Sequence, residues 1–295
     1  MKHLHESVIP LLELSDHERI ERIRNDRWIG YPRAKKIHDK LEDLLAHPRT
    51  LRMPNLLIVG DTNNGKTILV NRFFNQHKPH IQPSDEKLNA DVIYVQAPLK
   101  PDERRFYNSI LDVLFVPYRF NDRVEKKQQQ VISILKRIGV KMLIIDEIHH
   151  ILAGNVGAQR TFLNVIKYLA NELQIVIVGV GIKDAFNVIN SDPQLANRFE
   201  PAVLPKWQLN EEYLRLLASY EVILPLKKAS NLIESSLASK ILSLSEGTIG
   251  EISTIIKKAA IAAIKNGSEC ITKSLIDSID YISPSDRKRQ SELLR

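Results

Sequence analysis

The sequence predicts an α/β protein with a parallel sheet, preceded and followed by helical segments. Three observations indicate this class: apolar runs of strand length, amphipathic stretches of helical length between them, and the end of strand signals after Pro205. Continuous apolar runs are typical of strands buried on both faces, and their alternation with helices favours parallel pairing. We therefore expect a helical N-terminal extension over 1–50, an α/β core over 51–205, and a helical lid with a basic tail over 206–295.

The first fifty residues carry helical signals. Ser15 and Glu18 have the spacing of a capping box, and apolar residues recur on one helical face over 37–45. The stretch Trp28–Pro32 interrupts this periodicity with a glycine and a proline, which predicts a turn between two helices.

The core is predicted to contain five strands, separated by helices. The strands are expected at Leu56–Val59, Val92–Gln96, Met142–Ile145, Gln174–Gly179 and Ala202–Leu204. Helices of the core are expected at Glu103–Val116, Val124–Ile138 and Gln159–Glu172. After Pro205, four helices are expected at Glu211–Tyr220, Leu232–Leu244, Ile249–Lys265 and Ser274–Tyr281.

The composition is that of an ordinary globular protein. Of 295 residues, 43% are hydrophobic and 26% charged, which excludes disorder as the main state. Apolar runs fall far short of the roughly 20 residues that a membrane helix needs, and the N-terminus lacks a signal-peptide pattern, so we expect a cytoplasmic protein without membrane contact. Cys270 is the one cysteine, and the net charge of +7 permits an anionic partner without identifying it.

A phosphate-binding motif follows the first strand. The pattern G-x-x-x-x-G-K-[ST] stands between a predicted strand and a predicted helix, the context that its chemistry requires. Backbone N–H groups of such a loop face phosphate oxygens, the lysine reaches the β- and γ-phosphates, and the hydroxyl ligates Mg²⁺. We therefore expect ATP on a loop made of Gly60, Asp61, Thr62, Asn63, Asn64, Gly65, Lys66, Thr67 and Ile68.

Two carboxylates end the third predicted strand. Asp146 is expected to hold Mg²⁺ together with Thr67, and Glu147 to orient and deprotonate the attacking water. His149 and His150 follow, but neighbours about 100° apart on an α-helix do not have the spacing of a zinc site, so we expect no metal other than Mg²⁺ here.

A late arginine precedes the fifth strand. Arg198 lies in Asp192-Pro-Gln-Leu-Ala-Asn-Arg-Phe-Glu200, where it could stabilise charge on a γ-phosphoryl group of a neighbouring copy. From the residues alone, an ordinary surface arginine is the stronger alternative.

Together these motifs resemble an AAA+ ATPase. More narrowly, three strings resemble the TniB family of ATP-dependent transposition regulators, related to TnsC and more distantly to MuB. These strings are Arg27–Ala34, Arg52–Thr67 and Asp192–Phe199. The resemblance implies ATP hydrolysis, homo-oligomers as rings or helical filaments on double-stranded target DNA, a DDE transposase partner like TniA or TnsB, and a TniQ-like target selector. It also implies a bacterial, DNA-associated protein.

The resemblance assigns further residues. Arg198 becomes the candidate arginine finger, and the segment with Trp28, Ile29, Tyr31 and Pro32 is expected to pack on the nucleotide base, although a small hydrophobic corner between helices explains it equally. Related assemblies place residues after the second strand along DNA. Here these are Lys100, Arg104 and Arg105, continuing to Arg123, Lys126 and Lys127, and their contacts would be independent of DNA sequence.

Two departures predict slow, partner- or DNA-dependent hydrolysis. Ile182 stands where relatives often place a polar sensor, and the lid stretch from Glu246 to Ile252 has Glu251 and no arginine. Two other classes stay open. One is a helicase loader or DNA motor similar to IstB or DnaC, with fast DNA-stimulated turnover. The other is a nucleotide switch that does not need Glu147.

Overall fold

The structure is a computed structural model that describes residues 3–25, 27–82 and 87–293. The chain forms two compact units. The sheet unit contains Arg33–Asp61 and Lys66–Leu204. The helical unit contains the described residues up to Pro32, the four residues Thr62–Gly65, and the described chain from Pro205 onward.

A five-stranded parallel sheet forms the centre of the sheet unit, in the order β4-β5-β6-β1-β7. Its strands are β1 (Asn55–Gly60), β4 (Val92–Gln96), β5 (Met142–Asp146), β6 (Val176–Gly181) and β7 (Phe199–Leu204). Strand β1 lies between β6 and β7, with Leu56 opposite Val178 and Glu200. The carboxyl ends of β1 and β5 therefore lie at the same edge of the sheet, and this is where α/β sheets bind ligands.

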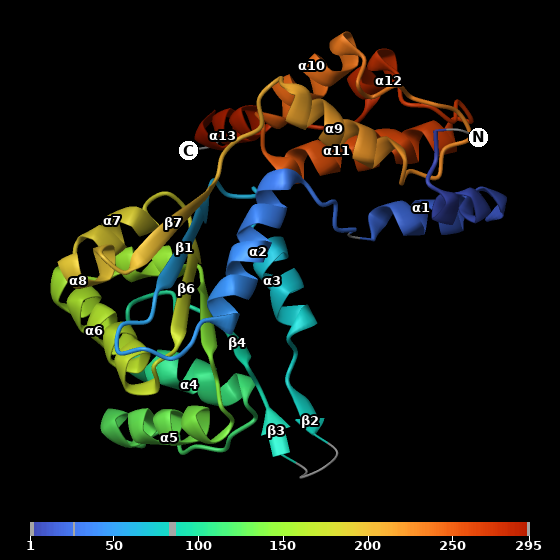
Figure 1. Cartoon of the computed structure of the whole chain (residues 1–295). Helices are drawn as coiled ribbons and strands as arrows, with labels where there is room; N and C mark the ends of the chain where they lie inside the picture. Colours follow the sequence, from blue (N-terminus) through green and yellow to red (C-terminus); the bar gives the residue numbers. More distant parts are fainter. Residues whose placement is uncertain (1–2, 26, 83–86, 294–295) are drawn as a thin grey trace. The chain divides into compact units, whose positions relative to one another are not determined.

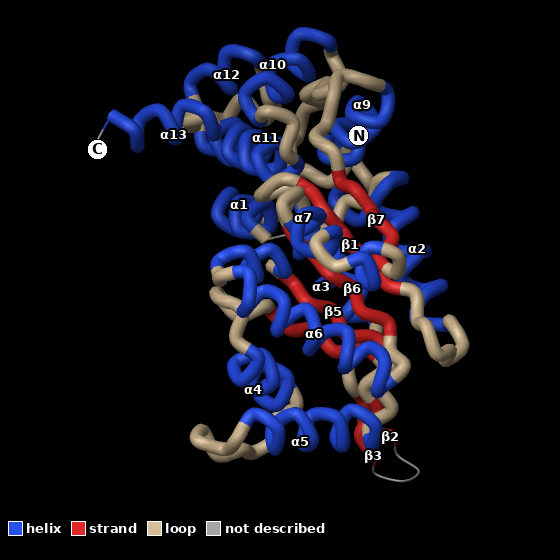
Figure 2. Tube along the Cα trace, turned by 90° about the vertical axis from the view of Figure 1, so that its left-hand side faces the viewer, coloured by secondary structure: helices blue, strands red, loops and turns tan. Residues whose placement is uncertain are grey.

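Helices cover both faces of this sheet (Figures 1 and 2). On one face lie α2 (Pro32–Ala46) and α3 (Lys66–Gln76). On the other lie α4 (Glu103–Val113), α5 (Val124–Arg137), α6 (Val156–Leu173), α7 (Ala185–Asn190) and α8 (Pro193–Ala196). Every residue of β1, β5 and β6 is buried, as expected for strands covered on both sides. The predicted α/β class with a five-stranded parallel sheet is confirmed.

Several expected helices differ from the observed ones by up to three residues at an end; for example, α4 ends at Val113 and not at Val116. Three further differences concern strands. Strand β6 begins at Val176, because Gln174 has a left-handed backbone (φ 51°) that ends α6. Strand β7 already begins at Phe199 and includes Pro201, which an edge strand tolerates. A hairpin of β2 (His80–Gln82) and β3 (Lys87–Asn89) was not expected.

The helical unit has its own core around α11 (Ile249–Lys265), most of whose isoleucines and alanines are buried. Its other elements are the 3-10 helix η1 (Glu6–Glu13) and α1 (Asp16–Arg24), α9 (Glu211–Glu221), α10 (Ser235–Ser245), α12 (Lys273–Ser278) and α13 (Pro284–Leu293). The capping box predicted at Ser15 and Glu18 is present. The described parts of the chain contain no helix long and apolar enough to span a bilayer.

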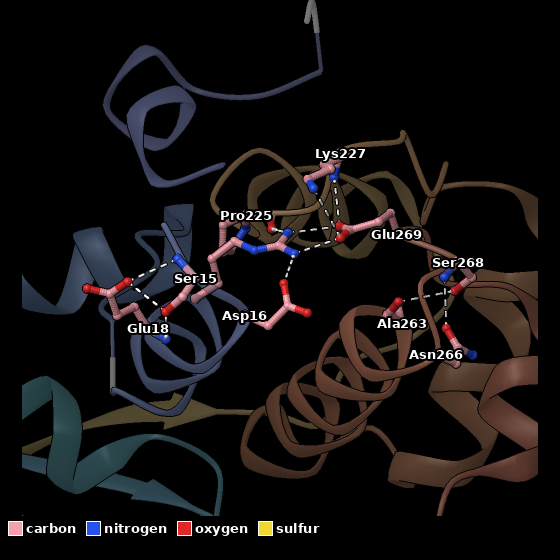
Figure 3. A network of polar contacts seen from close by, with 10 residues as sticks. Ser15, Asp16, Glu18, Pro225, Lys227, Ala263, Asn266, Ser268 and Glu269 are labelled. Atoms are coloured by element: carbon pink, nitrogen blue, oxygen red, sulfur yellow. Dashed lines mark hydrogen bonds and ion pairs between the residues drawn. The ribbon is translucent and has the colours of Figure 1, made fainter. Parts of the chain in front are cut away.

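A buried ion pair joins α1 to the loop before α12 (Figure 3). Both Nη atoms of Arg19 donate to the carboxylate of Glu269, at 2.9 and 2.6 Å. The same guanidinium also donates to Asp16 and to the carbonyl oxygen of Pro225. Arg19, one of several N-terminal cations in the sequence, is therefore an internal connector of the helical unit.

Candidate nucleotide-binding site

The lysine of the phosphate-binding motif is fixed by its own loop. Strand β1 ends at Gly60, and Lys66 begins α3. The buried Nζ of Lys66 donates to the carbonyl oxygens of Gly60 at 3.0 Å and Asp61 at 2.7 Å. Burial lowers the pKa of Lys66, while the nearby carboxylates of Glu147, Asp146 and Asp61 act to raise it. This places an ammonium group at the start of a helix, where backbone N–H groups also attract anions.

Thr67 and Asp146 meet at the carboxyl edge of the sheet. The hydroxyl of Thr67 donates to Oδ2 of the buried Asp146 at 2.9 Å, and Tyr94 on β4 donates to the same oxygen at 2.8 Å. Burial, followed by the hydrogen bond to Asp146, raises the pKa of Tyr94. A hydroxyl and a carboxylate in contact are the hard oxygen ligands that Mg²⁺ prefers, so the residues present fit this ion.

Glu147 follows with an unusual backbone. Its φ of 54° and ψ of 36° are left-handed, and a short 3-10 helix, η2 (Ile148–Ala153), begins directly after it. This conformation directs its carboxylate to His149, with Oε2 3.2 Å from Nδ1. Burial lowers the pKa of His149 although Glu147 opposes this, so the ring is mainly neutral near pH 7.

The two histidines lie close to each other and to Glu147. The rings of His149 and His150 are 4.9 Å apart, and ligand atoms of both and of Glu147 lie within 4.8 Å of one another. The spacing argument assumed an α-helix, whereas the left-handed residue and the 3-10 turn bring the side chains together. The three side chains form a compact polar group directly after Asp146 in the chain.

The middle of the phosphate-binding loop packs within the helical unit, against the first turn of α11. Gly250 N–H donates to the carbonyl oxygen of Asn63 at 3.0 Å, and Asn64 donates to the carbonyl oxygen of Pro205. A Cβ on Gly250 would lie 1.9 Å from Oδ1 of Asn63. Asn63 and Gly65 have positive φ values of 60° and 81°, so this curled backbone depends on residues that tolerate the left-handed region.

The segment expected to contact the base also lies in the helical unit. Ile29 and Tyr31 pack on its core. The ring of Tyr31 contacts that of Trp207 edge-on, with 5.0 Å between the ring centres. Trp28 is half-buried and Pro32 is exposed at the start of α2. The segment therefore contributes to the core of the helical unit, and its expected packing on the nucleotide base stays a prediction.

Arg198 and Ile182 lie in the sheet unit. Arg198 stands between α8 and β7, where its Nη1 donates to Asn171 on α6 at 2.6 Å. Ile182 directly follows β6 and is half-buried.

The cations expected to contact DNA divide into two kinds. Lys100, Arg104 and Arg105 are exposed on the loop after β4 and the first turn of α4, and Arg105 pairs with Asp102 at 3.5 Å. Lys127, in contrast, is fully buried, and its Nζ donates to Asn108 and lies 4.2 Å from the ring centre of Tyr118. The expectation that Lys127 continues the DNA-facing series is therefore wrong.

Sequence reasoning missed two polar partners of these residues. Tyr94 gave no motif signal, because its role depends on β4 lying beside β5, with Tyr94 opposite Ile144. Glu251 was noted only as an acid in the lid, yet its side chain accepts a hydrogen bond from Asn63 at 3.1 Å.

Comparison with known proteins places this geometry in a family. The family model "Bacterial TniB protein" matches residues 19–209. The chain is also 23% identical over 171 residues to the chaperone protein ClpB of Aquifex aeolicus, covering 57% of this chain but only 15% of that relative's length.

Solved structures share the fold at low identity. Cdc6p of Pyrobaculum aerophilum has a TM-score of 0.60 at 17% identity, covering 88% of this chain and 68% of that chain. ORC1 of Aeropyrum pernix in complex with DNA has a TM-score of 0.56 at 18% identity, covering 88% of this chain and 68% of that chain. Domain III of DnaA from Thermotoga maritima has a TM-score of 0.52 at 18% identity, covering 88% of this chain and 96% of that chain. These likenesses confirm the predicted AAA+ fold.

Proposed function

Because the chain belongs to the TniB family of bacterial proteins, we propose that it is an ATP-dependent regulator of transposition. In this proposal it binds ATP, oligomerises on duplex target DNA, and recruits and activates a DDE transposase, with hydrolysis controlling disassembly. The observation that carries the proposal is the convergence of Lys66, Thr67, Asp146 and Glu147 at the carboxyl edge of one parallel sheet.

The chain's own residues suggest how ATP is held and hydrolysed. Loop N–H groups and Lys66 bind the β- and γ-phosphates, while Thr67 and Asp146 would hold Mg²⁺. Bound Mg²⁺ supplies positive charge that offsets the charge of the phosphates. Glu147 orients the attacking water and accepts its proton, and its left-handed backbone sets the direction of the carboxylate.

Assembly completes the proposed site. Arg198 would enter the site of an adjacent copy, where a guanidinium stabilises charge developing on the γ-phosphoryl group. Its present partner Asn171 is a neutral amide, so Arg198 could exchange this bond for a phosphate without leaving a buried charge behind. A homo-oligomer, as a ring or a filament, follows from this requirement.

Duplex DNA is the proposed template. Exposed Lys100, Arg104 and Arg105 would contact phosphates, and such contacts do not depend on base sequence. The structurally similar ORC1 was solved with DNA, which supports DNA as a partner class for this fold. A transposase and a TniQ-like target selector are the protein partners implied by the family resemblance.

Electron microscopy with duplex DNA tests the proposal. We expect ordered rings or filaments for the wild type with ATP, and none with ADP or for Lys66→Ala. The matched control is Lys136→Ala, which removes a lysine paired with Glu172 on the surface of the sheet unit and should assemble normally. Assembly that is the same with ATP, ADP or no nucleotide would overturn the proposal. Rapid DNA-stimulated ATP turnover with strand separation would overturn it in favour of a loader or motor.

A further inference from the structure

A single buried carboxylate in the helical unit contacts both the phosphate-binding loop and the C-terminal helix. Oε1 of Glu251, in the first turn of α11, accepts hydrogen bonds from Nδ2 of Asn63 at 3.1 Å and from Nη2 of Arg287 at 2.6 Å. Its Oε2 accepts the hydroxyl of Tyr281 at 2.7 Å. Residues that are distant in sequence thus share one acceptor group.

Each contact of Glu251 has a different consequence. Asn63 has a left-handed backbone and is also held through its carbonyl oxygen by Gly250 N–H, so its side-chain bond to Glu251 is a second restraint on the loop. Tyr281 neutralises no charge. Arg287, from α13, is a cation in direct contact with the Glu251 carboxylate and balances its charge.

The exposed fractions of the two side chains indicate that the charge of Glu251 depends on Arg287 for its balance. The side chain of Glu251 is 10% exposed, whereas that of Arg287 is 51% exposed. Burial acts to raise the pKa of Glu251, but hydrogen bonds from Tyr281 and Arg287 outweigh burial and lower it, so the carboxylate is ionised near pH 7. Removing the arginine would leave a largely buried negative charge in contact with the loop.

We propose that Arg287 is a positioning residue for the phosphate-binding loop, acting through Glu251, so that the C-terminal helix α13 controls affinity for ATP. The inference rests on the proposed function in one respect, namely that this loop binds a nucleoside triphosphate. An uncompensated Glu251 repels a triphosphate more strongly than a diphosphate, because the triphosphate carries more negative charge. A cleft of about 400 Å³ adjoins this group of side chains and leaves Arg287 accessible to solvent.

Binding of fluorescently labelled ATP and ADP to the full chain tests this inference. We expect Arg287→Ala to weaken ATP binding about five-fold, equivalent to about 1 kcal/mol, and ADP binding less than about two-fold. Arg287→Lys should recover part of the ATP affinity. The matched control is Arg289→Ala on the same helix, because Arg289 pairs with Asp286 at 3.5 Å, and it should bind both nucleotides like the wild type.

A double-mutant cycle identifies Glu251 as the intermediary. In a Glu251→Gln background, Arg287→Ala should change ATP affinity by less than about 1.5-fold, because no charge remains to balance. If Glu251→Gln does not fold, as judged by its thermal unfolding, the unequal effects of Arg287→Ala on ATP and ADP still decide the matter.

The outcomes separate this inference from the proposed function. If the wild type binds labelled ATP and Lys66→Ala does not, but Arg287→Ala equals Arg289→Ala, the inference fails and the proposed function stands. Equal weakening of ATP and ADP binding by Arg287→Ala, or weakening that persists with Glu251→Gln, also overturns it. If the wild type binds neither nucleotide, both fail.

Discussion

Replacing Arg19 with methionine tests the buried ion pair of the helical unit. The side chain of Arg19 is 1% exposed and that of Glu269 10% exposed, whereas Asp16 is 68% exposed. The contact with Asp16 is therefore worth little, and the expected loss arises from Glu269, which would keep its charge away from water. The backbone N–H of Lys227 would still donate to this carboxylate at 3.2 Å, and the Lys227 ammonium lies 3.9 Å from its Oε1, too far for a hydrogen bond.

Breaking a buried pair by removing one partner destabilises proteins by about 3–5 kcal/mol, and we expect Arg19→Met to fall in this range. Urea unfolding followed by tryptophan fluorescence is the assay, because Trp28 and Trp207 both lie in the helical unit. The matched control is Arg22→Met on the exposed face of the same helix, which should change stability by less than about 0.5 kcal/mol.

The pH dependence of this variant follows from Glu269. In the wild type, the hydrogen bond from Arg19 holds the pKa of Glu269 below its usual value. The pair therefore stabilises the fold fully at pH values above the usual pKa of a glutamate, and this stabilisation is lost as the pH falls through the lowered pKa. Without Arg19, burial favours the protonated acid. The difference between wild type and variant should therefore shrink between about pH 7 and about pH 5.

A second variant separates charge burial from other causes. Replacing Arg19 and Glu269 together with methionine removes the orphaned charge and should return stability to within about 1 kcal/mol of the wild type. The reasoning is refuted if the single variant loses less than about 1 kcal/mol, or if its loss is the same at acid pH and in the double variant.

Two further predictions concern the candidate site. Glu147→Gln should keep ATP binding but slow hydrolysis at least about 100-fold, because an amide cannot accept the proton of the attacking water. Phosphate release measures this, and unchanged hydrolysis would favour a nucleotide switch. In Gly250→Ala the new Cβ would lie 1.9 Å from Oδ1 of Asn63, so the Asn63 amide must move away and lose its hydrogen bond to Glu251. We expect labelled ATP to bind more weakly by about 1 kcal/mol, and wild-type affinity would contradict the packing argument.

Local patterns in the sequence predicted much of the fold. The helix expected at Ile249–Lys265 coincides with α11, and the strand expected at Val92–Gln96 coincides with β4. Both have periodic or continuous apolar residues, a local pattern that predicts an element without knowledge of which distant partners cover it. The phosphate-binding loop and the Asp146–Glu147 pair could also be found, because their chemistry requires adjacent residues.

Contacts between distant residues could not be predicted. Arg19 and Glu269 are 250 positions apart, and from the sequence Arg19 looks like a surface charge on a helix and Glu269 like an exposed acid in a connecting loop. Lys127 lies in a polar stretch, yet the fold buries its stem and places Asn108 at its ammonium. The proximity of His149 to Glu147 depends on the left-handed backbone of Glu147 itself. This conformation could not be predicted, because it is typical of glycine or asparagine and not of glutamate.

The outer strand β7 limits how copies of this chain can join. Pro201 has no N–H to offer, and the guanidinium of Arg33 approaches the carbonyl oxygen of Val203 at 3.4 Å. A strand from another molecule would lack one donor here and would have to displace Arg33 from one acceptor, so extension of the sheet across β7 is disfavoured. Side-chain surfaces are therefore the favoured means of association on that flank, and subunits joined in this way can separate without breaking a shared backbone ladder.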